Sequence, residues 1–292
     1  MESERDFLLS LSPLVSAVIP TYNRANVISR AIRSVMTQTY RPIEIVVVDD
    51  GSEDDTSEVL LKFPGIKILA QANLGVSAAR NTGIANSTGS LVAFLDSDDE
   101  WLPEKIQKQV ELYTRDQPYF ICHTNEIWLR NEKPVSQKTI HLKQGGYFFE
   151  RALERCLISP SATVISRALL DEVGWFDERL VAAEDYDLWL RITSCYRVDF
   201  VDEPLVIKRA GESNQLSLVT PAIDRFRIIA LEKIISHANL RYDQRKAAIK
   251  TLVRKANILS AGCRKRGNIG EATYYSELAR KYSDINDEPQ GD

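Results

Sequence analysis

Residues 43–52 of the 292-residue chain, IEIVVVDDGS, decide the fold class. The nearly continuous apolar run of residues 43–48 is typical of a parallel strand that is buried on both faces. Asp49, Asp50 and the small residues that follow end this run abruptly. A strand of this kind needs helices on both sides of its sheet, so the stretch favours an α/β protein.

Short β-branched runs alternate with amphipathic segments around this stretch. Further strands are predicted at residues 15–20, 66–70 and 91–95. Helices are predicted at residues 28–35, 56–63, 75–85 and 103–113. Alternation of strands and helices implies right-handed crossovers and a mainly parallel central sheet flanked by helices.

The loops after the predicted strands are the place to look for chemistry, because ligands of open α/β sheets bind beyond the carboxyl ends of the strands. These loops read PTYNR at residues 20–24, DDGS at 49–52, QANLG at 71–75 and DSDDE at 96–100. One edge of the sheet is therefore lined by aspartates, an asparagine and small residues. Neither G-x-G-x-x-G nor G-x-x-x-x-G-K occurs in them, which disfavours dinucleotide oxidoreductases and kinases.

Asp96, Ser97 and Asp98 form a D-x-D motif directly after a buried strand. Neighbouring carboxylates repel one another, and a divalent cation relieves that repulsion. Oxygen-only ligands favour Mg²⁺ or Mn²⁺, which proteins commonly share with substrate phosphates. D-x-D also arises by chance, and residues 185–187 are a second copy, so a solvated acidic turn remains the alternative interpretation.

Five further side chains have ordinary explanations when each is taken alone. Glu184 and Asp185 begin a predicted helix, where acidic residues complement the helix dipole. Arg80 is explained as a surface charge, and Trp175 and Phe176 as core residues. Each of them therefore needs support from its sequence context.

The net charge of −4 conceals two regions of opposite sign. Residues 221–283 carry 14 basic and 5 acidic residues, a charge of +9, whereas residues 1–220 carry 23 and 32, a charge of −9. The last nine residues supply the remaining −4. An acidic total disfavours a nucleic-acid binder, since such proteins usually have a strongly basic domain.

The chain has no feature of a secreted or membrane-spanning protein. Its four cysteines lie more than thirty residues apart without a C-x-x-C motif, which is typical of reduced thiols in the cytoplasm. The N-terminus lacks the apolar run of a signal peptide, and no segment approaches the ~18 apolar residues of a membrane span. We expect a soluble, cytoplasmic protein that can sit peripherally on the inner face of the plasma membrane.

The composition changes near residue 215, which we predict to be a domain boundary. Within residues 1–215 the strand–helix alternation is regular over residues 15–115 and less regular over residues 116–215. Residues 216–292 are predicted to be helical, basic up to about residue 283 and acidic in the tail.

Five ordered blocks then carry a specific resemblance. They are residues 15–24 (VSAVIPTYNR), 44–52 (EIVVVDDGS), 73–81 (NLGVSAARN), 94–99 (FLDSDD), and 174–177 (GWFD) with 184–185 (ED). Together they resemble the family 2 inverting glycosyltransferases, which have the Rossmann-like GT-A fold of nucleotide-diphosphosugar transferases. The resemblance implies a nucleotide-sugar half at about residues 15–115 and an acceptor half at about 116–215, and it leaves the helical C-terminus uncovered.

The resemblance also implies where the sugar donor binds. The implied nucleotide-binding residues are Pro20, Thr21, Tyr22, Arg24, Asp50, Arg80, Asp96 and Ser97. Asp50 would accept a hydrogen bond from a nucleobase N–H. Asp98 would be the direct ligand of Mn²⁺ or Mg²⁺, and Asp96 would lie near the ribose or the metal. The acidic run leaves the register open, so Asp99 can replace either aspartate.

On the acceptor side, Asp185 matches the catalytic base of the family, and Trp175, Phe176 and Glu184 would line the acceptor. A carboxylate can remove the acceptor's proton while a metal neutralises the leaving diphosphate, so that one displacement inverts the anomeric carbon. The expected donor is a UDP-sugar, followed by GDP- or TDP-sugars. The expected acceptor is a saccharide or lipid-linked hydroxyl in cell-surface polysaccharide or glycoconjugate synthesis.

The sequence departs from the family in one place and leaves alternatives open. Family members often carry a histidine or another basic residue near the diphosphate after the last strand. Residues 208–215 (KRAGESNQ) contain no histidine, and Arg209 is the candidate there. A sugar-phosphate nucleotidyltransferase would need a Gly-rich loop where TYNR stands, and a non-catalytic sugar-nucleotide-binding relative is the other alternative. The basic residues 221–283 are expected to contact anionic lipids, or else to form a solvated cap or an oligomer surface.

Overall fold

The structure is a computed structural model that describes residues 12–113, 117–137, 139–210, 223–237 and 239–287. The chain divides into two compact units. Unit 1 comprises Met1–Tyr147, Leu157–Val181 and Arg197–Ser213, and unit 2 comprises Phe148–Cys156, Ala182–Tyr196 and Asn214–Asp292. All the described strands lie in unit 1, whereas the described secondary structure of unit 2 is helical.

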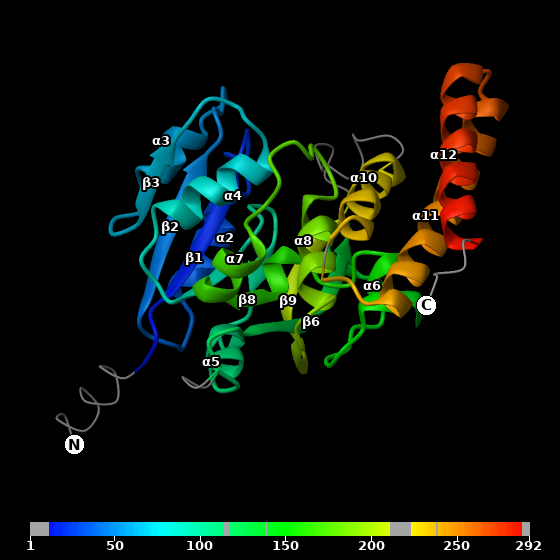
Figure 1. The fold of residues 1–292 in the computed structure, drawn as a ribbon. Coiled ribbons are helices and arrows are strands. Elements are labelled where there is room, and N and C mark those ends of the chain that lie inside the picture. The colour runs from blue at the N-terminus through cyan, green and yellow to red at the C-terminus, as the bar shows by residue number, and fades with distance from the viewer. Residues whose placement is uncertain (1–11, 114–116, 138, 211–222, 238, 288–292) are drawn as a thin grey trace. The chain divides into compact units, whose positions relative to one another are not determined.

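Unit 1 is built on one nine-stranded sheet within the described residues, and eight of its strands follow the order β3-β2-β1-β4-β8-β6-β9-β5 (Figure 1). Its strands are β1 (Val15–Thr21), β2 (Ile43–Asp49), β3 (Lys67–Ala70), β4 (Leu91–Phe94), β5 (Glu100–Trp101), β6 (Ile121–Arg130), β7 (Lys133–Pro134), β8 (Thr163–Ser166) and β9 (Asp199–Ala210). Its α-helices are α2 (Ile28–Met36), α3 (Thr56–Leu60), α4 (Val76–Ala85), α5 (Lys105–Val110) and α7 (Arg167–Val173).

Strands β1 to β4 are mutually parallel, and helices cover both faces of β1, β2 and β4, whereas most of the edge strand β3 is exposed. Helix α2 packs on the face that carries Val15 and Val47, whereas Ala79 of α4 packs on the face that carries Val46 and Val48. This two-sided burial explains why the strand sequences are apolar without alternation. The parallel arrangement sends the carboxyl ends of all four strands to one edge.

The rest of the sheet is mixed. Strand β8 is antiparallel to both β4 and β6, while β6 and β9 are parallel. Their register shifts around Asn125, opposite Pro204, whose ring nitrogen cannot donate a ladder hydrogen bond. Strand β5 then pairs antiparallel with β9, with Glu100 opposite Ile207. This last pairing brings the acidic residues after β4 next to the end of β9.

The observed elements confirm the predicted strands of the first half and shorten two of its helices. Helix α3 ends at Leu60, and α5 begins at Lys105 instead of at Pro103. The Pro103 carbonyl accepts the Thr39 N–H, at 2.9 Å, so the turn before α5 is tied to another loop. Strand β5 and the helices α6 and α7 were not predicted, since two to seven residues show no measurable periodicity.

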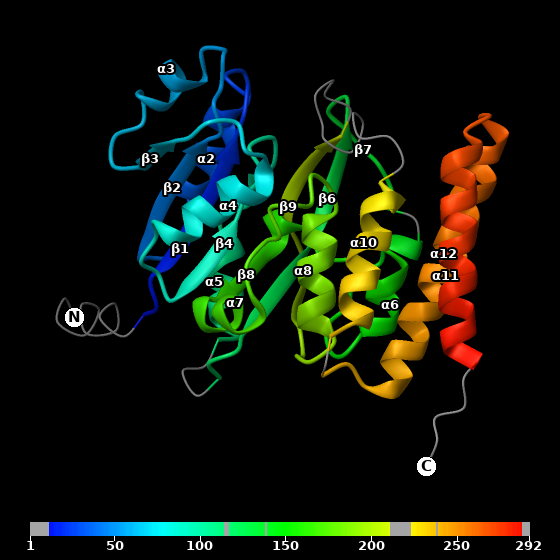
Figure 2. The same ribbon diagram turned by 45° about the horizontal axis from the view of Figure 1, so that its top comes forward.

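Unit 2 consists of α6 (Phe149–Glu154), α8 (Glu184–Thr193), α10 (Asp224–Ile235), α11 (Tyr242–Lys265) and α12 (Ile269–Asp287). Helix α11 packs against α6, α10 and α12, and it runs side by side with α12 (Figure 2). The predicted helical C-terminal region is present, although the boundary predicted near residue 215 and the end of the acidic tail lie outside the described residues. Among the described helices, none is both long enough and apolar enough to cross a bilayer.

His123 lies fully buried in β6 of unit 1. Its Nε2–H donates to the Gln144 carbonyl at 2.9 Å, and its ring lies 5.0 Å from that of Phe200. Burial, assisted by Lys143, lowers the pKa of His123 to about 3, whereas a histidine in an unfolded chain titrates near 6.5. At a pH between these two pKa values, His123 takes up a proton when the protein unfolds. The folded state therefore loses stability as the pH falls from about 6.5 toward 3.

We expect the unfolding free energy of the wild type to fall more steeply than that of His123→Gln between about pH 6 and pH 4.5, by about 1 kcal/mol per pH unit. Glutamine can still donate to Gln144 but does not titrate. Urea unfolding at constant ionic strength measures both slopes, and His237→Gln, at an exposed position, should keep the wild-type slope. Parallel slopes for wild type and His123→Gln would contradict this explanation.

Candidate active site

The loops after β1 and β2 are tied together by bonds between side chains and backbone. The Asn23 N–H donates to the Ser52 hydroxyl at 2.9 Å, and the Asn23 side-chain oxygen accepts the N–H of Glu53 at 2.7 Å. The Arg24 N–H donates to the Thr56 hydroxyl, also at 2.9 Å. The predicted nucleotide-binding residues of both loops therefore belong to one ordered surface at the carboxyl edge of the strands.

Asp50 organises the third loop of this edge. Its carboxylate is 4% exposed and accepts from the Gln71 amide at 2.7 Å, the Leu74 N–H at 3.0 Å and the Gly75 N–H at 2.8 Å. The next residue, Gly51, has φ +80°, and a Cβ there would lie 2.9 Å from a backbone nitrogen of the 71–75 loop. Only glycine fits this turn.

Arg80 and Asp96 join helix α4 to the D-x-D loop. Arg80 Nη2 lies 2.7 Å from Asp96 Oδ1, and the Arg80 side chain is only 4% exposed. Burial alone would raise the pKa of Asp96, but Arg80 and Lys208 hold it below its usual range. The structure thus brings two predicted nucleotide-binding residues into direct contact and keeps this carboxylate ionised.

Asp99 is held by a different cation. It is 2% exposed, and its Oδ2 lies 3.0 Å from Lys208 Nζ and accepts the Ser161 hydroxyl at 2.6 Å. Burial, with Asp96 and Asp98 adding to it, raises the pKa of Asp99 to about 7 against the opposing effect of Lys208. Burial disfavours the Lys208 ammonium, yet Asp99 and the nearby Glu126 raise its pKa above its ordinary value.

Of the basic pair at residues 208–209, Lys208 is therefore the residue that pairs with Asp99. Arg209, the candidate from sequence, instead pairs with Glu100 at 3.1 Å and with Glu132 at 3.1 Å. Glu100 also lies 3.6 Å from Arg30, which donates to the Asp98 carbonyl at 3.3 Å. Three acids of the 96–100 run thus each have an identified cation from another element.

The chemistry of this loop fits a divalent cation that completes its ligands from a substrate. Among the described residues, no group of three or more His, Cys, Asp or Glu side chains could hold a metal ion by itself. Asp96 and Asp98 are both half-buried and supply only oxygen ligands. Mg²⁺ and similar hard ions are commonly bound by one or two carboxylates together with substrate phosphates.

Arg80 and Asn81 are consecutive residues that hold different loops. The Asn81 side chain donates to the Phe176 carbonyl at 2.9 Å and accepts the Phe176 N–H at 3.1 Å. The Phe176 ring lies beneath Arg80, 5.1 Å from its guanidinium carbon, and packs edge-on against Phe94. Phe176 is 4% exposed, so this predicted acceptor residue is also part of the core under Arg80. Trp175 is half-buried.

Asp185 lies in the first turn of α8, in unit 2. Its Oδ2 accepts the Cys156 thiol at 3.2 Å, and its Oδ1 accepts the Tyr186 N–H at 2.6 Å. Ala183, the residue before the helix, has φ +58°, a left-handed conformation that costs a residue with a Cβ roughly 1–2 kcal/mol. Glu184 is 5% exposed.

The second D-x-D copy, residues 185–187, has a structural explanation for its last aspartate. Asp187 is 2% exposed and pairs with Arg191 at 3.0 Å and with Lys233 at 2.7 Å. The pair with Arg191 lies within α8, and the pair with Lys233 ties α8 to α10 within unit 2. The two copies thus differ in their surroundings: the first follows β4 directly, and the second lies in the first turns of α8.

The family assignment follows from comparison with known proteins. Residues 16–174 match the family model described as glycosyl transferase family 2. The chain belongs to this family. The match covers β1 to β8 and the D-x-D loop, and it ends before α8 and the C-terminal helices of unit 2.

Curated relatives agree with the assignment. A glycosyltransferase of Rickettsia conorii is 35% identical over 205 residues, which cover 68% of this chain and 33% of that protein. One of Rickettsia prowazekii is 34% identical over 210 residues, covering 68% of this chain and 64% of that protein, so the chain spans less than two thirds of either. WfgD of Escherichia coli, a UDP-Glc:alpha-D-GlcNAc-diphosphoundecaprenol beta-1,3-glucosyltransferase, is 35% identical, over 61% of this chain and 69% of that protein.

Solved structures confirm the predicted GT-A fold with its helical extension. S. aureus TarS 1–349 in complex with UDP-GlcNAc has a TM-score of 0.61 and 18% identity, and the match covers 91% of each chain. Mannosyltransferase PcManGT of Pyrobaculum calidifontis, in complex with GDP-Man and Mn²⁺, has a TM-score of 0.61 and 16% identity over 95% of this chain and 84% of that one. At these identities the likeness concerns the fold alone.

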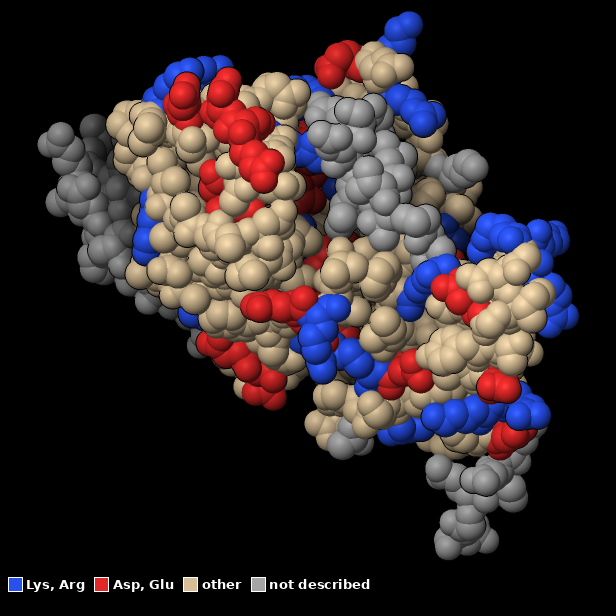
Figure 3. Space-filling view, turned by 90° about the horizontal axis from the view of Figure 1, so that it is seen from above, with Lys and Arg blue, Asp and Glu red and all other residues tan. Residues whose placement is uncertain are grey.

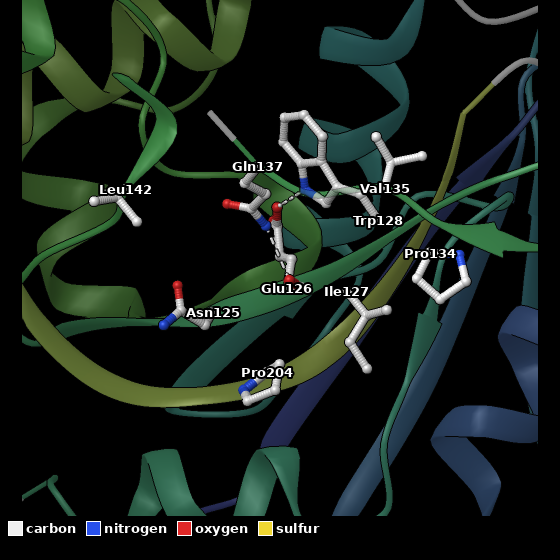
Figure 4. A pocket seen from close by; sticks show the side chains of 9 residues that line it. All are labelled: Asn125, Glu126, Ile127, Trp128, Pro134, Val135, Gln137, Leu142 and Pro204. Atoms are coloured by element: carbon white, nitrogen blue, oxygen red, sulfur yellow. Dashed lines mark hydrogen bonds between the residues drawn. The ribbon is translucent and has the colours of Figure 1, made fainter. Parts of the chain in front are cut away.

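A pocket of about 310 Å³ opens beside β6 in unit 1 (Figure 4). Its lining residues are Asn125, Glu126, Ile127, Trp128, Pro134, Val135, Gln137, Leu142 and Pro204. Burial would raise the pKa of Glu126, but Lys143, 2.9 Å away, and Lys208 lower it to about 2. The Trp128 indole N–H donates to the same carboxylate at 2.9 Å. None of the sequence-predicted site residues lines this pocket.

Sequence reasoning missed three residues that hold the site together. Ser161 bonds both the Asp99 carboxylate and the Asp96 N–H, and Lys208 also donates to the Ser159 hydroxyl at 2.9 Å. Asn81 belongs to the family-like block 73–81, but the sequence does not show that it bonds the backbone of Phe176. The one available signal was the basic pair at residues 208–209 after the last predicted strand, of which Lys208 pairs with Asp99 and Arg209 with Glu100.

We expect Lys208→Met to lower the free energy of unfolding by about 3 kcal/mol, because it leaves the Asp99 carboxylate buried without its cation. Adding Asp99→Asn to the same chain should restore part of the loss. Urea unfolding at pH 7.5 measures all three proteins. Lys108→Met, which removes the exposed pair with Glu203, is the matched control and should cost less than about 1 kcal/mol. Equal losses of unfolding free energy for Lys208→Met and Lys108→Met would contradict the role of Lys208 as the cation that stabilises the buried Asp99.

Proposed function

We propose that the protein is a metal-dependent, inverting glycosyltransferase that transfers a sugar from a UDP-sugar to a hydroxyl of a saccharide or lipid-linked acceptor. The observation that carries the proposal is the Arg80–Asp96 ion pair, which fixes the D-x-D loop at the carboxyl edge of a family 2 domain. The names of the E. coli relatives WfgD and WfaP specify UDP-Glc and a diphosphoundecaprenol-linked GlcNAc, which supports this donor and acceptor class. Synthesis of a cell-surface polysaccharide or glycoconjugate is the corresponding process.

The loops at the strand ends support the donor half of the proposal. The Thr21 hydroxyl oxygen is buried and lacks a hydrogen-bond partner in the part of the chain that the structure describes, and Tyr22 beside it is 41% exposed. A buried hydroxyl of this kind gains a hydrogen bond when a polar ligand arrives. Asp50 uses three of its roughly four acceptor positions within the protein, which leaves one for a nucleobase N–H.

The pairing of the acidic run supports Asp98, and not Asp99, as the metal ligand. Asp99 is committed to Lys208 and Ser161, whereas the half-buried Asp98 shares the outer part of the loop with Asp96. A divalent cation held there supplies positive charge that offsets the charge developing on the leaving diphosphate. Arg80, through Asp96, sets the position of the loop.

Asp185 is the proposed catalytic base, and this assignment rests on the sequence match to the family. Its carboxylate accepts the Cys156 thiol and the Tyr186 N–H, so that its orientation is defined by two donors. A carboxylate so placed accepts the proton of the acceptor hydroxyl as the new glycosidic bond forms. On the acceptor side, we assign Trp175 and Glu184 to contact with the acceptor. Phe176 packs its ring against the Arg80 guanidinium and holds it in place.

Asp98→Asn should reduce Mn²⁺-dependent transfer by at least about 10²-fold, because the amide is a weaker ligand and no longer offsets the metal charge. Turnover is followed by release of UDP from a panel of UDP-sugars with a membrane extract as acceptor source. Glu58→Gln, an exposed acid of α3, is the control and should keep wild-type activity. Unchanged metal dependence in Asp98→Asn would rule out this ligand.

Asp185→Asn should retain donor affinity while transfer falls by about 10²–10⁴-fold, since only proton removal is lost. Calorimetric titration with the UDP-sugar and Mn²⁺ measures binding, and UDP release measures transfer. Substantial residual transfer would exclude Asp185 as the base. A wild type that binds the donor but never releases its nucleotide would instead favour the non-catalytic alternative.

A further inference from the structure

We propose that the connection between α11 and α12 is a docking surface for membranes with anionic headgroups. This hairpin tip consists of Arg264, Lys265, Arg266 and Ile269. All four side chains are exposed, and Ile269 is 60% exposed. In Figure 3 the Lys and Arg side chains gather at the right of the view, where these helices lie.

The tip is an ordered structure and not a loose loop. Gly267, at φ +77°, reverses the chain, and the N–H groups of Arg266 and Asn268 donate to the Cys263 carbonyl at 3.1 and 3.0 Å. Asn268 then begins α12, where its side-chain oxygen accepts the Glu271 N–H at 3.3 Å. The Ser260 hydroxyl donates to the Ala272 carbonyl at 2.7 Å and joins the two helices just below the tip.

Several cations of unit 2 have a carboxylate partner, whereas none is found for the tip cations among the described residues. Arg225 pairs with Glu271 and Lys255 with Asp224, at 2.7 and 3.2 Å. Within the described residues no ion pair is found for Arg264, Lys265 or Arg266. Three adjacent, exposed cations without a carboxylate partner among the described residues therefore lie at one end of the hairpin, where Arg266 also donates to the Cys263 sulfur at 3.6 Å.

Helix stability explains part of this pattern but not all of it. Basic residues in the last turn of a helix complement its dipole, and that accounts for Arg264 and Lys265 at the end of α11. It does not account for an isoleucine exposed among them at the start of α12. An exposed apolar side chain within five residues of three exposed cations matches the interface of an anionic bilayer, where the headgroups attract the charges and the acyl region receives the apolar group.

A lipid-linked acceptor resides in a membrane, so docking would bring the protein to the acceptor of the proposed function. The biological role of the docking surface therefore rests on that proposed function. Docking through the tip itself does not require catalysis. The two proposals can therefore fail separately.

The test is flotation of the full chain with vesicles of phosphatidylcholine containing 30% phosphatidylglycerol, and with phosphatidylcholine alone. We expect binding to the anionic vesicles only, with a loss of at least about tenfold between 0.1 and 0.5 M salt. The triple variant Arg264→Gln, Lys265→Gln and Arg266→Gln should lose at least about tenfold in partitioning, and Ile269→Ser should lose severalfold.

The matched control removes three exposed cations from the same helices away from the tip: Lys246→Gln, Lys250→Gln and Arg280→Gln. It should keep at least half of the wild-type binding. Equal losses in both triple variants would mean that net charge alone drives binding, and would overturn the proposal. Circular dichroism checks that each variant is folded.

Two further outcomes would also overturn it. If the wild type forms dimers in analytical ultracentrifugation that the tip variant does not, the tip is a contact between copies of this chain. If single-stranded RNA releases the protein from anionic vesicles and binds the same tip residues, the surface is a general polyanion site. A tip variant that keeps transfer to a water-soluble acceptor while losing vesicle binding separates docking from catalysis, whereas vesicle binding without any transfer would reject only the proposed function.

Discussion

The acidic run after β4 is the constraint on which the rest of unit 1 depends. Several carboxylates within five residues repel one another, and burial makes each one more costly unless a cation accompanies it. The fold supplies Arg80 from α4, Arg30 from α2, and Lys208 and Arg209 from β9. The folded acidic loop therefore depends on cations from elements that are far apart in the chain.

Consecutive residues divide this work. Arg80 reaches the D-x-D loop while Asn81 holds the loop around Phe176, and Lys208 meets Asp99 while Arg209 meets Glu100. The pairing of β5 with β9 makes the second correspondence possible, since it aligns two short acidic and basic stretches that are about a hundred residues apart in the chain. Adjacent residues of one motif, such as Arg80 and Asn81, thus hold two different loops.

This division also explains how far prediction from sequence could reach. The strands β1, β2 and β4 were predictable because burial on both faces leaves a continuous apolar signal. The loops after them were predictable as a group because a parallel sheet sends all its carboxyl ends to one edge. The Lys208–Asp99 and Ser161–Asp99 contacts could not be predicted from the sequence, because they depend on the antiparallel pairing of β8 with β4 and of β5 with β9. The left-handed Ala183 gives no signal at all, since alanine is an ordinary helix former.

The three donors that Asp50 receives have a consequence for how tightly any ligand can bind at this edge. Because Gln71, Leu74 and Gly75 are already bonded to that carboxylate, the 71–75 loop gives up little freedom when a ligand arrives. Immobilising a loop or side chain at a binding surface ordinarily opposes association, and a loop ordered in advance avoids most of that loss. A small, highly charged ligand with few contacts can then be retained by a shallow edge of a sheet.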